Sequence, residues 1–104
     1  MNNYAIATVS DFSGCAVFRG DATDARKLCM GTGLKSGMVR FEGMIGDDFN
    51  NMTATVSYFN RADDYTVCMY EHSASTGEVI NSERLAVKSL ESALRFAHGW
   101  CIAD

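Results

Sequence analysis

The stretch Ser89-Leu-Glu-Ser-Ala-Leu-Arg-Phe-Ala-His-Gly99-Trp100 decides the fold, because it combines a helical pattern with signals for both helix ends. Its apolar residues recur at intervals of three and four, which places four of them on one helical face. They are Leu90, Ala93, Leu94 and Ala97. Ser89 can accept a hydrogen bond from an unpaired first-turn N–H, and Gly99 can turn left-handed where a helix stops. We therefore expect a helix that ends at Gly99 and packs closely against a sheet.

The segments before this helix have the composition or the alternation of short strands. The clearest is 52–59, in which Thr53, Thr55 and Ser57 alternate with apolar residues and make a polar face that meets water. Strands are expected over 4–10, 15–19, 38–44, 52–59, 65–71 and 78–82. A short helix is expected over 22–30, where Asp21 or Thr23 can cap the first turn. The sequence predicts one α+β domain over residues 1–104: an antiparallel sheet of five or six strands with two helices packed on one face, in the order β-β-α-β-β-β-β-α.

Composition narrows the class of protein. The chain has 104 residues, of which 47% are hydrophobic, as in an ordinary globular domain. It contains no apolar run of about 18 residues and no basic segment followed by an apolar one, so we expect no membrane contact and a cytoplasmic location. The net charge of −4 argues against direct nucleic-acid binding, which usually needs a basic patch.

The cysteines carry no obvious chemistry. None of Cys15, Cys29, Cys68 and Cys101 forms a C-x-x-C pair, and each lies in an apolar or alternating segment. We expect reduced, buried thiols that act as small hydrophobic residues.

Metal and cofactor motifs are weak. Cys68 with His72, and His98 with Cys101, could together offer two sulfur and two nitrogen ligands to zinc, but histidine at a helix C-terminus is explained more simply by the helix dipole. The glycines of 31–37 follow a helix instead of opening one, unlike a dinucleotide-binding loop. We expect no cofactor and no metal.

No catalytic signature is present. No serine lies in a G-x-S-x-G elbow, and the acidic pairs lie in predicted turns. A small enzyme remains an alternative, which requires a pocket that gathers His72 or His98 with a thiol or a carboxylate.

Acidic residues gather in the middle of the chain, where basic residues are sparse. Such a patch could steer the protein toward a basic surface of a partner, including the nucleic-acid-binding surface of a host complex. An aromatic residue inside a polar turn can anchor a partner. The candidate partner-binding residues are Asp47, Asp48, Phe49, Asp63, Asp64 and Tyr70.

Three segments in the C-terminal part carry a general resemblance to a class of known proteins. They are Tyr65-Thr-Val-Cys-Met-Tyr70, Gly77-Glu-Val79 and Ser89-Leu-Glu-Ser-Ala-Leu-Arg-Phe-Ala97. With the preceding hairpin and short helix, this order resembles small α+β proteins encoded by phages and mobile elements, among them host-takeover inhibitors and anti-CRISPR proteins. The resemblance implies a non-enzymatic protein that binds and blocks a host or defence complex. It assigns no role to any single residue. A dimeric structural subunit, joined through a sheet edge or an open face, is a further alternative.

Overall fold

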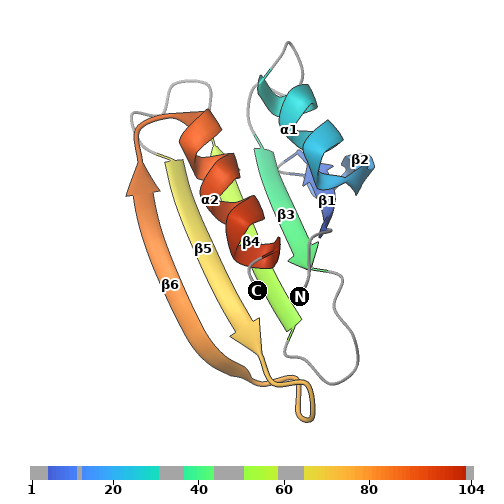
Figure 1. The fold of residues 1–104 in the computed structure, drawn as a ribbon. Coiled ribbons are helices and arrows are strands. Elements are labelled where there is room, and N and C mark those ends of the chain that lie inside the picture. The colour runs from blue at the N-terminus through green and yellow to red at the C-terminus, as the bar shows by residue number, and fades with distance from the viewer. Residues whose placement is uncertain (1–4, 12, 31–36, 44–50, 59–64, 103–104) are drawn as a thin grey trace.

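A computed structural model describes residues 5–11, 13–30, 37–43, 51–58 and 65–102, which form one sheet and two helices (Figure 1). The elements are β1 (Ala5–Ser10), β2 (Ala16–Asp21), α1 (Ala22–Met30), β3 (Gly37–Gly43), β4 (Asn51–Tyr58), β5 (Tyr65–His72), β6 (Val79–Val87) and α2 (Leu90–Ile102). The predicted α+β fold and the order of its elements are confirmed, with six strands in the sheet.

The six strands lie in the order β2-β1-β3-β4-β5-β6, and every neighbouring pair is antiparallel. β1 and β2 form a hairpin whose turn contains Gly14 at a φ of 91°, a conformation that favours glycine. The chain then passes through α1 to β3, which pairs with the other side of β1. From β3 to β6 the strands follow one another in space as they do in sequence, so β2 and β6 are the two edges.

Both helices lie on the same face of the sheet (Figure 1). α1 packs over β1 and β2, and α2 packs mainly over β4 and β5. The core between the layers contains Phe41 and Leu94, both fully buried. A fully buried side chain of this size contributes about 1.5–3 kcal/mol relative to an exposed one. The small residues Ala93 and Ala97 are also fully buried and let α2 approach the sheet closely, as the sequence predicted.

The predicted starts of both helices are confirmed. At α2, Ser89 Oγ accepts a hydrogen bond of 3.1 Å from the Ser92 backbone N–H. At α1, Asp21 Oδ1 accepts one of 2.8 Å from the Thr23 N–H, so Asp21 is the capping residue. Each bond satisfies an N–H that has no partner within its own helix.

The predicted end of α2 is wrong, because the helix continues through Gly99 to Ile102. The reason is packing beyond the glycine. Cys101 is fully buried, and its Sγ lies 3.5 Å from the Phe41 carbonyl oxygen. Contacts of the last turn with the sheet therefore outweigh the weak helix propensity of glycine, which costs about 1 kcal/mol relative to alanine.

The predicted last strand is too short, because β6 extends to Val87 instead of ending at Ser82. Its residues are mostly exposed, so they lack the alternation that marks a half-buried strand. Its backbone nevertheless pairs with β5 along the whole strand, from His72↔Val79 to Tyr65↔Val87. The bounds of the other strands differ from the predicted ones by at most two residues at either end.

All four cysteines are in the thiol form, and they differ in their exposure to solvent. Cys29 and Cys101 are buried, as predicted. Cys15 is exposed, so the prediction of a buried thiol is wrong there. It lies between the β1–β2 turn and β2, where its backbone N–H donates to Asp11 Oδ1 at 3.1 Å. Cys68 is partly exposed on the face of the sheet opposite the helices.

Candidate functional site: the open face of the sheet

The strand register aligns one residue from each of the six strands across the face opposite the helices, here called the open face. Residues directly opposite one another on neighbouring strands share a face, and the buried residues on either side point toward the helices. The aligned residues, here called the arginine row, are Arg19, Thr8, Arg40, Thr55, Cys68 and Arg84. Three arginine residues therefore lie in one row across the sheet of an acidic protein.

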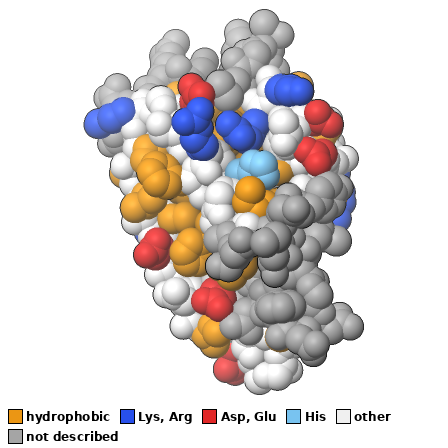
Figure 2. Space-filling view, viewed as in Figure 1, with side chains coloured by type: hydrophobic (Ala, Val, Ile, Leu, Met, Phe, Trp, Pro, Cys, Tyr) orange, Lys and Arg blue, Asp and Glu red, His pale blue; other side chains and the backbone are white. Residues whose placement is uncertain are grey.

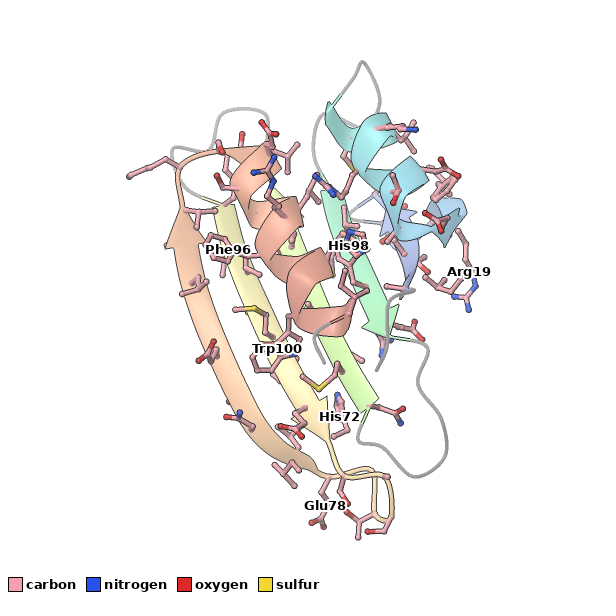
Figure 3. All side chains as sticks on the ribbon, viewed as in Figure 1. Arg19, His72, Glu78, Phe96, His98 and Trp100 are labelled. Carbon is pink, nitrogen blue, oxygen red and sulfur yellow. The ribbon has the colours of Figure 1, made fainter. Side chains whose placement is uncertain are left out.

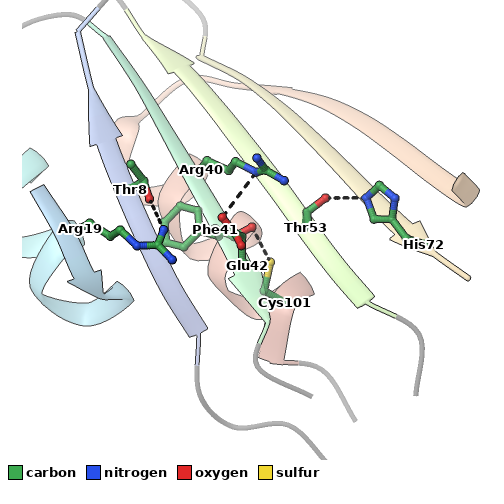
Figure 4. A network of polar contacts seen from close by, with 8 residues as sticks. All are labelled: Thr8, Arg19, Arg40, Phe41, Glu42, Thr53, His72 and Cys101. Carbon is green, nitrogen blue, oxygen red and sulfur yellow. Dashed lines mark hydrogen bonds and ion pairs between the residues drawn. The ribbon is translucent and has the colours of Figure 1, made fainter. Parts of the chain in front are cut away.

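Two of the three arginines are positioned by neighbours on the same face (Figure 4). Arg19 Nη1 donates a hydrogen bond of 3.2 Å to Thr8 Oγ1. Arg40 Nε lies 3.8 Å from Glu42 Oε1, and the Arg40 side chain is 56% exposed. An exposed pair at this distance contributes only about 0–1 kcal/mol, so it leaves Arg40 available to another anion. Within the described ranges, Arg84 has no ion pair.

A hydroxyl–imidazole pair lies beside the arginine row. Thr53 Oγ1 and His72 Nε2 are 3.0 Å apart, and His72 Nδ1 lies 3.3 Å from the Gly77 carbonyl oxygen (Figure 4). Because a carbonyl only accepts, Nδ1 is the donor to Gly77, and Nε2 of the neutral ring then accepts the Thr53 hydroxyl. The ring therefore joins β4 to the turn between β5 and β6.

This pair lines a cleft of about 420 Å³ at the end of the sheet. The lining includes Arg40, Glu42 and Asn51. The enzyme alternative would use this cleft, since it gathers His72 with a carboxylate. However, both ring nitrogens already have partners within the protein, which explains His72 as a structural link between strands.

The candidate partner-binding residues divide by position. Tyr70 lies on the open face in β5, one row from Cys68, with its ring centre 6.3 Å from that of His72. Its side chain is partly exposed, so it can contribute to a contact there. The other five lie outside the described residues: Asp47, Asp48, Phe49, Asp63 and Asp64.

The four residues considered for zinc do not come together. Cys68 and His72 lie on the open face, whereas His98 and Cys101 belong to α2 on the opposite face. His98 stacks on Phe41 with ring centres 6.0 Å apart, and its burial, helped by the charge of Arg26, lowers its pKa. The sheet thus separates the two halves of the set. No group of three or more potential metal ligands occurs within the described parts of the chain.

The sequence did not reveal the arginine row. Alternation places Arg40 opposite Phe41, and so on the polar face of its own strand. It does not say which residues of the other strands lie beside Arg40, because that depends on the register of five separate pairings.

Comparison with known proteins gives no matching family model, no matching curated protein and no matching solved structure. Among the described residues, neither helix has the length and apolar character needed to cross a membrane.

Proposed function

We propose that this chain is a non-enzymatic protein-binding module that holds an acidic segment of its partner on the open face. The arginine row is the observation that carries the proposal. Arg19, Arg40 and Arg84 lie on three different strands, so a rigid sheet fixes their spacing. A surface with fixed spacing loses little conformational entropy when it binds.

The chemistry of arginine favours carboxylates as the groups bound. A guanidinium can form two parallel hydrogen bonds with one carboxylate, which gives both strength and orientation. Asp21 and Glu42 are acidic residues in the next row, where Asp21 caps α1 and Glu42 lies 3.8 Å from Arg40. The arginine row itself contains three positive charges and no acidic residue, although the whole chain has a net charge of −4.

The residues between the arginines also suit the binding of an acidic peptide. Thr8, Thr55 and Cys68 have short side chains, so the arginines stand above their neighbours. An extended peptide could lie across the strands and place its acidic side chains against successive guanidinium groups. The hydroxyls of Thr8 and Thr55 offer further hydrogen bonds to such a segment.

A module of this kind acts by occupying a surface, which agrees with the resemblance to phage-type inhibitors. In this proposal the partner is a host or defence protein whose acidic segment becomes blocked. The proposal requires no catalytic group and no cofactor.

The test uses fluorescently labelled short peptides rich in Asp and Glu, with fluorescence anisotropy as the readout. The wild-type chain should bind them, and rising salt should weaken the binding because exposed charges are screened. A variant with Arg19→Gln, Arg40→Gln and Arg84→Gln should bind at least about tenfold more weakly.

The matched control carries Lys27→Gln, which removes an exposed positive charge from the helix side and lies outside the arginine row. This variant should bind like the wild type. Equal losses in both variants would contradict the assignment to the open face. A single-stranded oligonucleotide and a neutral peptide serve as further labelled probes in the same assay. Tighter binding of the oligonucleotide than of the acidic peptides would contradict the proposal and indicate nucleic-acid binding.

A further inference from the structure

An apolar groove runs between α2 and β6, on the face opposite the arginine row. It has a volume of about 670 Å³. Figure 2 shows hydrophobic side chains gathered there, and Figure 3 shows Phe96 and Trp100 directed from α2 toward β5 and β6. Met69 and Leu85 belong to the same lining, and Phe96 is 51% exposed. Phe96 extends the apolar lining of the groove into a contiguous exposed patch, and such patches are typical of contact surfaces.

The groove exists because the helix layer is narrower than the sheet. α2 packs mainly over β4 and β5, so the helix side of the edge strand β6 lies beyond it. Glu83 and Leu85 pair with Met69 and Val67, both buried, which places them on the helix side. A further helix laid beside α2 would cover this part of β6.

We infer that the groove is filled by a second copy of this chain, with α2 of each copy lying over β6 of the other. The surface is self-complementary, as a two-fold interface requires. It offers a projecting ring, Phe96, and next to it an apolar hollow that includes Leu85. Two-fold symmetry places the ring of each copy against the hollow of the other.

The charges on the two walls of the groove favour this arrangement. Glu83 lines the β6 wall and Arg95 lines the α2 wall. When α2 of one copy lies over β6 of the other, Arg95 of each faces Glu83 of its partner, which makes two identical ion pairs. Arg95 also contacts Glu91 at 3.2 Å, but both of these side chains are more than half exposed, so that pair is weak.

The outward side of α2 permits close approach of another helix. Ser92 and Gly99 line the groove next to Phe96 and are seven positions apart, which places them on one helical side. Their small size brings a neighbouring backbone close. The inference thus rests on four features of one surface: the ring, the hollow, the opposite charges and the small residues.

The dimer would leave both open faces outward, since the copies meet through their helix sides. Each dimer then presents two arginine rows and can hold two acidic segments at once. If these segments belong to one partner complex, binding becomes bivalent and stronger than either single contact. The dimer does not depend on the proposed function, because a monomer would still carry one complete arginine row.

The experiment is analytical ultracentrifugation of the full chain at about 1 to 100 µM, a range that detects micromolar dimers. The expected mass at the upper concentration is twice the 11.4 kDa of one chain. Phe96→Ser should give a monomer. Glu83→Arg and Arg95→Glu should each weaken dimerisation about tenfold, and the double variant should restore it to near the wild-type level.

Glu78→Arg is the matched control, since Glu78 is an exposed acid just before β6 and is not part of the groove. It should dimerise like the wild type. A monomeric wild type throughout the range would overturn the inference. A dimer that is insensitive to Phe96→Ser, or a double charge variant no better than the single ones, would also overturn it. Circular dichroism on every variant verifies that the fold is intact.

Discussion

The indole Nε1–H of Trp100 donates a hydrogen bond of 2.9 Å to the backbone carbonyl of Tyr70. The two residues are thirty positions apart in the chain, and the bond ties the last turns of α2 to β5. The Tyr70 side chain lies on the open face, beside His72. The helix layer thus helps to position a residue on the opposite side of the sheet.

Trp100→Phe should lower the free energy of unfolding by about 1 kcal/mol, because phenylalanine keeps an apolar ring and loses the N–H donor. Urea denaturation measures this difference. Glu91→Gln is the control: it alters an exposed position of α2 and should change stability by less than about 0.5 kcal/mol. A Trp100→Phe variant as stable as the wild type would show that the hydrogen bond contributes nothing net.

Ser89→Ala should destabilise the chain by about 1 kcal/mol, because it removes the acceptor for the Ser92 N–H. Ser89→Asn should keep most of the stability, since asparagine is an equally good capping residue. Thermal unfolding by circular dichroism compares the two. Equal losses in both variants would contradict a capping role for Ser89.

Cys15 should react first with iodoacetamide at pH 8, since it is exposed, whereas Cys101 should react only after unfolding. Burial raises the pKa of the Cys101 thiol to about 12, so it stays protonated and unreactive in the folded chain. Peptide mapping by mass spectrometry follows both sites. Modification of Cys101 at the rate of Cys15 would show that the last turn of α2 opens readily.

The raised pKa of the Cys101 thiol also makes the folded chain less stable at alkaline pH. The unfolded thiol ionises near its ordinary value of 9.0, while the folded thiol ionises near 12. Its stabilising effect is complete below about pH 9 and is lost as pH rises toward 12. Urea denaturation at several pH values should show this decline, and Cys101→Ala should reduce it. An unchanged decline in the variant would assign the effect to other groups.

His98 should make the chain less stable in mild acid. Burial first, and then the charge of Arg26, lowers its pKa below the ordinary 6.5, while Asp21 acts in the opposite direction. The unfolded chain therefore takes up a proton more readily, and stability present above pH 6.5 is lost as pH falls through the lowered pKa.

Urea denaturation between pH 7 and pH 5 measures the effect of His98. His98→Phe should flatten the acid decline, since it keeps a ring that can stack on Phe41 and removes the titrating group. His72→Gln is the matched control for the other histidine and should keep the decline. The reverse pattern would assign the decline to His72.

A separate prediction concerns the acidic residues that lie outside the described ranges. If Asp47, Asp48, Asp63 and Asp64 contact a basic surface of the partner, reversing them to lysine should abolish binding to an identified partner complex. Surface plasmon resonance measures the loss. Unchanged binding would exclude a role for the acidic residues and leave the open face as the proposed contact.

Local sequence patterns correctly predicted the features that depend only on residues close together in the chain. Periodicity placed Ala93, Leu94 and Ala97 on the buried face of α2, and alternation placed Val56 on the buried face of β4. Capping residues located both helix starts. These properties depend on neighbours within a few residues, so they can be read along the chain.

Other features depended on contacts between distant segments. The continuation of α2 through Gly99 required the packing of Trp100 and Cys101 against the sheet. The length of β6 required pairing with β5, because only Leu85 and Val87 among its own side chains are partly buried.

The sequence by itself determined the order of the elements, the buried sides of β4 and α2 and the α+β class, because periodicity and capping are local. Only the tertiary structure decided the register of the six strands. That register brings Arg19, Arg40 and Arg84 into one row. The packing of α2 on the other face separates Cys101 from Cys68 by the thickness of the sheet. The physical reason is that hydrogen bonds between distant strands fix the register, and a single strand carries no record of its neighbours.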